Sequence, residues 1–166
     1  MDHLWSPWRY QYVSSAGSVP LGKDDCFFCR SAANPAEDAA NLVVLRAERS
    51  LVLLNRYPYT SGHVLIAPYE HVPTLAEAEV ATLEEMMRLA QRCESVLRRV
   101  YRPHGLNFGF NIGPAAGAGV AGHIHMHGLP RWMGDTSFMT TVGETRVLPE
   151  DLASTREKLA AAFSDT

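Results

Sequence analysis

The sequence predicts an α+β protein with an antiparallel sheet, one long helix and a C-terminal helix. Three observations lead to this prediction. Short apolar runs separated by turn residues lie between residues 43 and 67. A long segment with helical periodicity spans residues 74–101. Two more extended segments then precede an amphipathic stretch at residues 149–163.

The first three strands are expected in the apolar runs. Residues 43–45 and 51–54 are separated by a polar turn, and residues 55–62 are rich in turn-forming residues. A third run, residues 63–67, ends at Pro68. This order predicts neighbouring strands joined by short connections.

The long helix is predicted to start at Thr74 and to end near Tyr101. Thr74 with Glu77 three residues later has the spacing of a capping box. The sequence Pro103-His104-Gly105 then terminates the segment. The expected buried stripe consists of Leu75, Leu83, Met86, Met87, Ala90, Cys93, Leu97 and Val100.

A second pair of strands follows the long helix. Residues 106–112 alternate between apolar and small or polar side chains, which is typical of a strand. A Gly/Ala loop, residues 113–122, connects them to a histidine-rich strand. We expect these two strands to be antiparallel neighbours, although a loop of this length is long for a hairpin and indicates a function.

The domain organisation is expected to be simple. Residues 1–25, with Trp5 and Trp8, are predicted to form an N-terminal arm, and residues 26–166 a single domain. The chain has a formal net charge of −3, so no general electrostatic affinity for nucleic acid or anionic lipid is expected. It also lacks an apolar run of membrane-spanning length and a signal-peptide pattern, which favours the cytoplasm.

Three histidines at alternate positions, His123, His125 and His127, form the most informative motif. On an extended strand their rings would share one face of the sheet. Such a row can bind a metal ion or provide nucleophilic and acid–base chemistry near neutral pH. The spacing alone leaves both possibilities open. The glycine-rich loop before the row offers backbone N–H groups to phosphate oxygens.

The three cysteines divide into a pair and a single residue. Cys26 and Cys29 have the spacing of a zinc knuckle or of a redox pair. No thioredoxin-like βαβ pattern surrounds them, which favours zinc. Cys93 lies in the helical pattern and is expected in the core.

Two segments of the chain resemble the signature of the histidine triad superfamily of nucleotide hydrolases and transferases. The first is His-Ile-His-Met-His-Gly-Leu-Pro-Arg, residues 123–131, preceded by Asn111-x-Gly113-x-x-Ala116-Gly117. The second, residues 53–68, is similar to an upstream block of that family. Residues 130–139 and 5–9 resemble bacterial diadenosine tetraphosphate phosphorylases and hydrolases of the fragile-histidine-triad-like branch. The resemblance implies a histidine triad fold.

The resemblance also implies roles for individual residues. His125 would be the nucleophile that attacks the α-phosphorus of an adenine nucleotide, and His127 would contact the leaving-group oxygen. His123 would orient the site together with His63, or bind zinc. Asn55 would hold the ribose hydroxyls. Phosphate contacts would come from Asn111, Gly117, Ala118 and Gly119.

A structural zinc and a homodimer are further implications of the resemblance. The zinc ligands would be Cys26, Cys29, His71 and His123, a closed Cys₂His₂ set that leaves the other two triad histidines for catalysis. The chain departs from the family pattern at two places. Ala118-Gly119 stands where many members have Gln followed by Ser or Thr. Gly128 stands where a β-branched residue is usual, and the sequence offers no reason for it.

The resulting functional hypothesis is an enzyme that cleaves dinucleoside polyphosphates through a nucleotidyl-histidine intermediate. Two alternatives stay open at this point. One is a nucleoside phosphoramidase or adenylylsulfate-cleaving enzyme that uses the same intermediate. The other is a non-catalytic, zinc-stabilised nucleotide-binding protein, which the presence of His125, His127, Asn55 and Asn111 disfavours.

Overall fold

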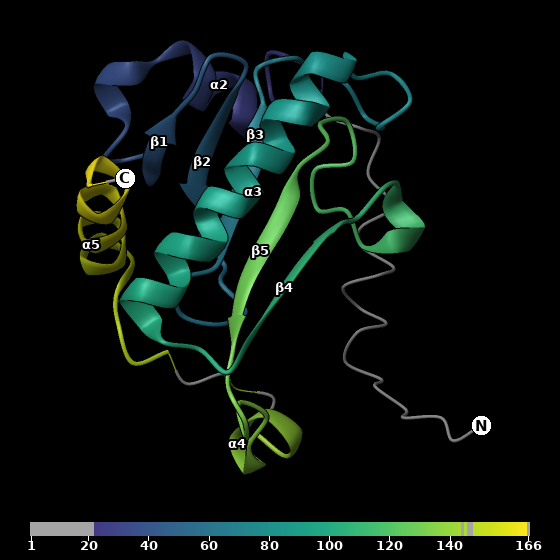
Figure 1. The fold of residues 1–166 in the computed structure, drawn as a ribbon. Coiled ribbons are helices and arrows are strands. Elements are labelled where there is room, and N and C mark those ends of the chain that lie inside the picture. The colour runs from purple at the N-terminus through teal and green to yellow at the C-terminus, as the bar shows by residue number, and fades with distance from the viewer. Residues whose placement is uncertain (1–21, 144, 146–147, 166) are drawn as a thin grey trace.

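The computed structural model describes residues 22–143, 145 and 148–165. A five-stranded antiparallel sheet with strand order β1-β2-β3-β5-β4 forms its centre (Figure 1). The strands are β1 (Val43–Arg46), β2 (Ser50–Leu54), β3 (Val64–Pro68), β4 (Gly105–Phe110) and β5 (Met126–Arg131). The expected α+β class and the antiparallel pairing of the last two strands are confirmed.

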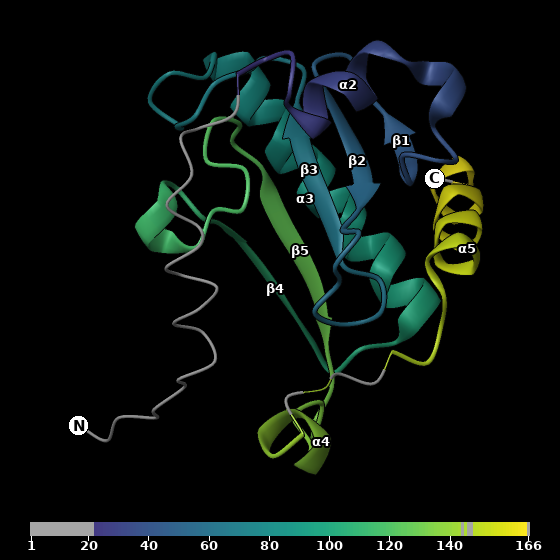
Figure 2. The same cartoon turned by 180° about the vertical axis from the view of Figure 1, so that it is seen from behind.

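Helices lie on both faces of the sheet. The long helix α3 crosses the face seen in Figure 1, and the short helix α2 lies on the opposite face, seen in Figure 2. Helix α5 packs beside β1 and against α3. The α-helices are α2 (Phe27–Ala33), α3 (Val80–Tyr101), α4 (Phe138–Thr141) and α5 (Leu152–Ser164). Two 3₁₀ turns, Pro35–Glu37 and Pro114–Ala116, complete the described elements.

The sheet has an apolar layer on each face. On the α3 side, Val52 and Ile66 of the central strands pack with Met86 and Leu97. On the α2 side, alternate residues of the same strands, such as Leu53 and Leu65, form a smaller cluster with Phe28 and Cys26. Strands β2 and β3 are therefore buried on both faces, which makes them a rigid base for the loops at their ends.

The long helix begins later than its sequence predicts. Helix α3 starts at Val80 rather than at Thr74, and its N-cap residue Glu79 makes no side-chain capping bond. The Thr74 hydroxyl donates instead to the carboxylate of Glu77 at 2.8 Å, so the expected capping box does not form. The prediction failed because these two side chains satisfy each other and not the helix backbone.

Two residues assigned to the buried stripe of the long helix are exposed. Leu75 precedes the helix and is 38% exposed, and Met87 within the helix is 57% exposed. The C-terminal helix also starts later than predicted, at Leu152. Asp151 caps it by accepting a hydrogen bond from the backbone N–H of Ser154 at 2.9 Å.

The histidine row is only partly a strand. Strand β5 begins at Met126, so His127 lies in it while His123 and His125 precede it. The expectation of one continuous histidine strand was wrong, because the preceding segment leaves the sheet; there the backbone N–H of Ile124 donates to Val72 rather than to a strand partner. Strand β4 likewise ends at Phe110, two residues before its predicted end.

Helices α2 and α4 had no counterpart in the sequence prediction, because both are too short for a clear 3.6-residue period. Most of the expected arm, including Trp5 and Trp8, lies outside the described residues. In the part of the chain that is described, no helix is both long and apolar enough to cross a bilayer.

Candidate active site and metal centre

A cavity of about 740 Å³ opens on the α2 side of the sheet. It brings together helix α2, the β2–β3 loop, the glycine-rich loop and the start of β5, four segments far apart in the sequence. The lining residues are Phe27, Phe28, Asn55, Arg56, Tyr57, Tyr59, Leu65, Gly117, Gly119, Val120, His125 and His127. Apolar and aromatic walls with a few convergent polar groups are typical of a small-molecule site.

The hydrogen bond of His125 fixes the position of its ring proton. Its Nδ1 lies 2.9 Å from the carbonyl oxygen of His123, which can only accept, so Nδ1 carries the proton. The other nitrogen, Nε2, therefore keeps its lone pair. Burial lowers the pKa of His125 below its ordinary value, against the opposing effect of the carbonyl bond. A neutral, oriented imidazole of this kind is a nucleophile.

A hydrogen-bonded chain fixes the proton of His127 as well. The backbone N–H of Tyr59 donates to His63 Nδ1 at 3.2 Å, which leaves the His63 proton on Nε2. That Nε2–H donates to His127 Nδ1 at 2.9 Å. His127 must then carry its own proton on Nε2. Burial, with a smaller effect of His125, lowers the pKa of His127 to about 4, so its ring is neutral at pH 7.

The two triad rings at the cavity therefore differ in hydrogen-bonding character. The ring centroids of His125 and His127 are 5.0 Å apart. His125 offers a lone pair at Nε2, and His127 offers an N–H donor at the same atom. Neighbouring groups with these opposite characters are what an in-line displacement at phosphorus requires.

Asn55 lies in the same network. Its side-chain oxygen accepts from the backbone N–H of Tyr57 at 2.9 Å, and its Nδ2 lies 3.4 Å from His63 Nδ1. Asn55 thus lines the cavity, next to the histidine that supports His127. His63 itself is only 1% exposed, which agrees with a supporting position rather than a substrate contact.

The glycine-rich loop contributes to the cavity unevenly. Gly117 and Gly119 line it, whereas Ala118 is buried behind them and Asn111, just after β4, is not among the described lining residues. The backbone N–H of Gly117 donates to Pro114 at 2.9 Å, within the loop. Gly117 has φ +85, a left-handed conformation that explains the glycine.

Four aromatic residues that line the cavity were not predicted from the sequence. These are Phe27, Phe28, Tyr57 and Tyr59. The signal that could have found the first two is their position between the cysteines Cys26 and Cys29, because any ligand-bound pair of cysteines fixes the residues between them. The tyrosines lie in a turn, where no periodicity marks them.

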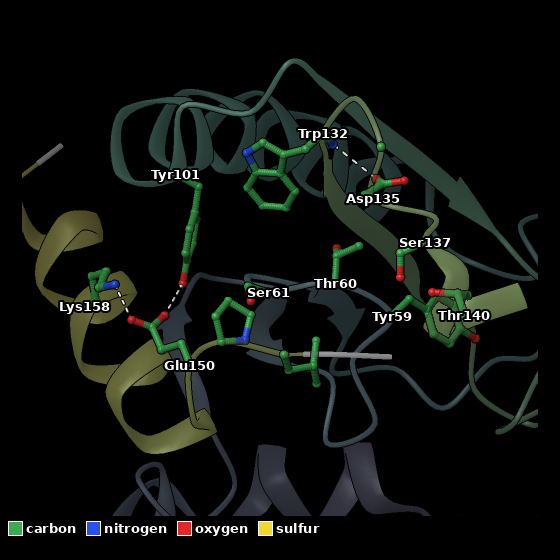
Figure 3. A pocket seen from close by; sticks show the side chains of 13 residues that line it. Tyr59, Thr60, Ser61, Tyr101, Trp132, Asp135, Ser137, Thr140, Glu150 and Lys158 are labelled. Carbon is green, nitrogen blue, oxygen red and sulfur yellow. Dashed lines mark hydrogen bonds and ion pairs between the residues drawn. The ribbon is translucent and has the colours of Figure 1, made fainter. Parts of the chain in front are cut away.

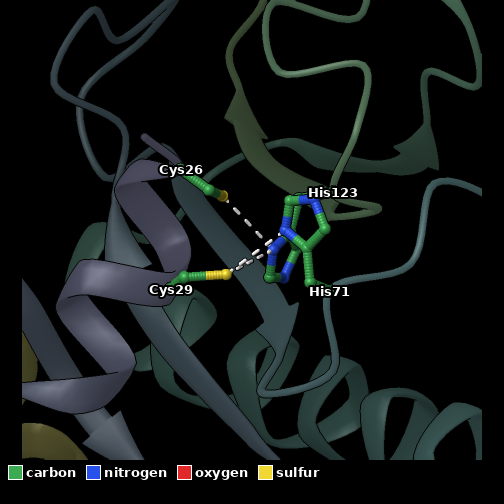
Figure 4. Close-up of side chains that lie close together, drawn as sticks. All are labelled: Cys26, Cys29, His71 and His123. Atoms are coloured by element: carbon green, nitrogen blue, oxygen red, sulfur yellow. Dashed lines mark hydrogen bonds between the residues drawn. The ribbon is translucent and has the colours of Figure 1, made fainter. Parts of the chain in front are cut away.

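The cluster expected to bind zinc is assembled in the structure (Figure 4). Cys26, Cys29, His71 and His123 bring one ligand atom each to within 4.8 Å of one another. His123 Nδ1 lies 3.4 Å from Cys26 Sγ and 3.6 Å from Cys29 Sγ, and His71 Nδ1 lies 3.2 Å from Cys29 Sγ. The four residues come from α2 and its N-cap position, the segment after β3 and the segment before β5.

The surroundings of the cluster suit a metal ion. His123 Nε2–H donates to the carbonyl oxygen of Pro68 at 2.9 Å, which leaves Nδ1 unprotonated toward the sulfurs. Burial and the neighbouring Cys26 raise the pKa of the Cys29 thiol to about 11. A cation among the sulfurs would reverse this effect by stabilising the thiolates. Two thiolates and two imidazoles form a closed tetrahedral set, the usual form of structural zinc.

Phe28 connects the metal centre with the cavity. Its ring centroid lies 5.0 Å from that of His123 and 4.8 Å from that of His125. The side chain is 2% exposed, so it is held between the two imidazoles. Helix α2 and its N-cap residue Cys26 thereby carry two of the cluster's ligands and one contact to His125.

The structure explains the glycine that follows the triad. Gly128 lies between Val64 and Phe108 in the sheet. A Cβ atom at this position would lie 2.7 Å from Phe108 Cε1 and 2.9 Å from Val64 Cγ2. A β-branched residue would clash here, so the glycine makes room for the Phe108 ring rather than for a special backbone angle.

Comparison with known proteins agrees with this geometry. The HIT domain family model matches residues 36–133. AP-4-A phosphorylase of Mycobacterium tuberculosis is 36% identical over 173 residues, which cover 99% of this chain and 85% of that protein. The asymmetrical bis(5'-nucleosyl)-tetraphosphatase of Schizosaccharomyces pombe is 30% identical over 95 residues, 57% of this chain and 52% of that protein.

A solved structure of a related protein has a similar fold. The crystal structure of a Zn-bound histidine triad family protein from Mycobacterium smegmatis superposes with a TM-score of 0.68 and 30% identity. The match covers 87% of this chain and 96% of that one. The family model, the relatives and the assembled histidines lead to one conclusion: the chain belongs to the HIT family.

Proposed function

We propose that this protein cleaves dinucleoside polyphosphates of the diadenosine tetraphosphate type through a nucleotidyl-His125 intermediate. The main support is the pair of neutral imidazoles of His125 and His127, whose Nε2 atoms have opposite hydrogen-bonding character. The activities for which the relatives from M. tuberculosis and S. pombe are named support the same substrate class.

The first chemical step follows from the two tautomers. The lone pair of His125 Nε2 attacks the α-phosphorus, a N–P bond forms and the P–O bond to the distal phosphates breaks. The electron pair moves to the leaving oxygen, to which His127 Nε2–H donates a hydrogen bond. His63 holds His127 in this tautomer through the 2.9 Å bond. Water or inorganic phosphate then attacks the same phosphorus and frees His125.

The remaining residues bind and orient the nucleotide. Asn55 would hold the ribose of the nucleotide that becomes attached to His125, and Phe27 would contact its base; both residues line the cavity. Phosphate contacts are assigned to the segment around Gly117 and Gly119, with Ala118 supporting the loop from beneath. Asn111, which is not among the lining residues of the cavity, is also assigned a phosphate contact.

The metal centre is assigned a structural role. Cys26, Cys29, His71 and His123 would hold one zinc ion, which when bound ties α2 to the segments around the cavity. The chain's own residues carry out the chemistry, since the four ligands fill a tetrahedral site and leave no open position for substrate. We also propose a cytoplasmic location, where cysteines stay reduced and can bind zinc.

A homodimer is part of the proposal. Strand β4 is at one edge of the sheet, and beside it lies a groove of about 340 Å³ lined by Met87, Phe108 and Phe110. An unpaired strand edge next to an apolar groove is suited to pairing with a second copy. Light scattering should report a dimer for the wild type and a monomer for Met87→Asp. Val80→Asp, on the same helix and more exposed to solvent than Met87, should stay dimeric.

Turnover of diadenosine tetraphosphate, with and without inorganic phosphate, tests the function directly. ADP and ATP formed only with phosphate would identify phosphorolysis, and AMP with ATP would identify asymmetric hydrolysis. His125→Ala should abolish turnover and leave nucleotide binding largely intact. His104→Ala, an exposed histidine outside the cavity, is the matched control. Substantial activity of His125→Ala would contradict the mechanism.

The intermediate can be trapped. Brief incubation with adenine-labelled substrate followed by denaturation should leave acid-labile label on the wild type and none on His125→Ala. The same label from a nucleoside phosphoramidate or from adenylylsulfate, at higher kcat/KM, would favour those alternative substrates. Binding without any labelling or turnover would identify a nucleotide-binding protein.

A further inference from the structure

A second cavity of about 550 Å³ lies next to the first, and Figure 3 shows it from close by. We propose that it binds the second nucleoside of the substrate, the one that departs with the leaving phosphates. This inference rests on the proposed function, because only a substrate with a nucleoside at each end needs two such sites. Its volume is within the range of small-ligand sites.

The two cavities meet at a single side chain. Tyr59 lines both of them. Its ring lies nearly parallel to that of His127, with an interplanar angle of 11° and centroids 6.2 Å apart, and 4.8 Å from the ring of His63. The second cavity is therefore bordered by the ring that stacks on His127, the residue assigned to the leaving group. A substrate whose first nucleoside is near Asn55 would extend its distal end in this direction.

The walls of the second cavity offer aromatic surface. In Figure 3, Trp132 and Tyr101 lie on one side of the space, and Tyr59, Ser137 and Thr140 lie on another. Trp132 packs edge-on against Tyr101, at 85° and 6.4 Å between centroids. The contact with Tyr101 holds the Trp132 indole in a fixed orientation, in which a nucleobase can stack on it. Aromatic side chains are the usual platforms for nucleobases.

The Trp132 segment is held in place by charge. Asp135 accepts from the backbone N–H of Trp132 at 3.1 Å. The same carboxylate accepts two hydrogen bonds from the Arg131 guanidinium, at 2.6 and 2.9 Å. The turn after β5 is thus closed on itself, and the indole is preorganised before any ligand arrives. Preorganisation reduces the entropic cost of binding.

The charges of this cavity favour a nucleoside over a phosphate group. Lys158 forms an ion pair with Glu150, and Glu150 also accepts from the Tyr101 hydroxyl at 2.9 Å. Asp135 is paired with Arg131. A phosphate needs cations that are available to it, whereas here the nearby cations are already paired with carboxylates. The walls suit the neutral, aromatic end of the substrate.

The inference can be tested by removing the second nucleoside from the substrate and the indole from the protein. Diadenosine tetraphosphate and adenosine 5′-tetraphosphate share the first nucleoside and the tetraphosphate chain, and they differ in the second nucleoside. Trp132→Ala should lower kcat/KM for the dinucleoside compound by about 10-fold, the loss expected for one stacked base. It should change kcat/KM for the mononucleoside compound by less than about twofold. Trp132→Phe should recover most of the loss.

Two outcomes would overturn the inference. Equal losses for both compounds would mean that Trp132 only supports the structure, and no loss for either would mean that the base binds elsewhere. If neither compound is turned over, the proposed function fails. Calorimetry then tests the nucleoside site separately, by measuring the affinity of the wild type and of Trp132→Ala for both compounds. A selective loss of affinity for the dinucleoside compound would support it, and equal affinities would refute it.

Discussion

Gly128→Ala provides a quantitative test of the packing across the sheet. The added Cβ would lie 2.7 Å from Phe108 Cε1 and 2.9 Å from Val64 Cγ2, whereas carbon atoms normally approach to about 3.5–4.0 Å. Because these two contacts lie on opposite sides of Gly128, a shift that relieves one tightens the other. Val64 is fully buried, so most of the adjustment falls on Phe108 in the edge strand.

The expected destabilisation can be worked out from these contacts. Overpacking of a well-packed site costs about 1–3 kcal/mol. Replacing a glycine in a strand recovers roughly 0.5–1 kcal/mol of backbone entropy. The net loss of unfolding free energy should therefore lie between about 0 and 2.5 kcal/mol, which lowers the Tm by up to about 10 °C for a chain of this size.

Urea and thermal denaturation with a matched control measure this effect. Gly109→Ala is the control, because Gly109 lies in the neighbouring strand and a Cβ there meets nothing within 4 Å. In a Phe108→Leu background the cost of Gly128→Ala should shrink by at least about 1 kcal/mol. The reasoning is refuted if Gly128→Ala is as stable as Gly109→Ala, or if its cost is the same in both backgrounds.

Two more predictions concern the metal centre and the histidines. Zinc should raise the unfolding free energy by about 4 kcal/mol when it is present at 1,000 times its Kd, and a chelator should reverse this. Cys29→Ser should lose this response, while Cys93→Ala, which alters a core cysteine outside the cluster, should keep a stoichiometry of one zinc. If zinc raised the Tm of Cys29→Ser as much as that of the wild type, this would count against the site. Acid should destabilise the fold through His127: its pKa is lowered from 6.5 to about 4 by burial, so the unfolded chain binds more protons than the folded chain between these values, and stability falls as the pH is lowered from about 6.5 to 4. The urea midpoint of His127→Gln should decline less over this window, and parallel declines of the two proteins would contradict the assignment.

Much of the fold followed from local patterns. The strands of residues 43–68 and the long helix were predictable because their apolar periods extend over several residues. The errors lie at the ends of the helices and strands, where the hydrogen bonds of single residues decide at which residue an element begins. Thr74 bonds to Glu77 and not to the backbone, and His125 precedes the strand in which the pattern placed it.

The candidate site was predictable to a similar degree. The residue types and spacing of the triad and of Cys26-x-x-Cys29 indicated their chemistry. The resemblance to a family supplied distant partners such as His63 and His71. For the aromatic wall formed by Phe28, the only signal was its position between the two cysteines. Tyr59 could not be foreseen, because nothing in a turn marks a side chain as facing a cavity.

The sequence by itself determined which chemical groups the protein possesses: alternate histidines, a cysteine pair and strands with alternating apolar faces. Only the tertiary structure decided what each histidine can do. His123 faces the cysteines because Pro68 accepts its Nε2 proton, and His125 keeps a free Nε2 because the carbonyl of His123 accepts its Nδ1 proton. His127 presents an N–H because His63, 64 residues earlier, occupies its Nδ1. The physical reason is that a histidine's tautomer is set by its hydrogen-bond partners, and the fold brings those partners together.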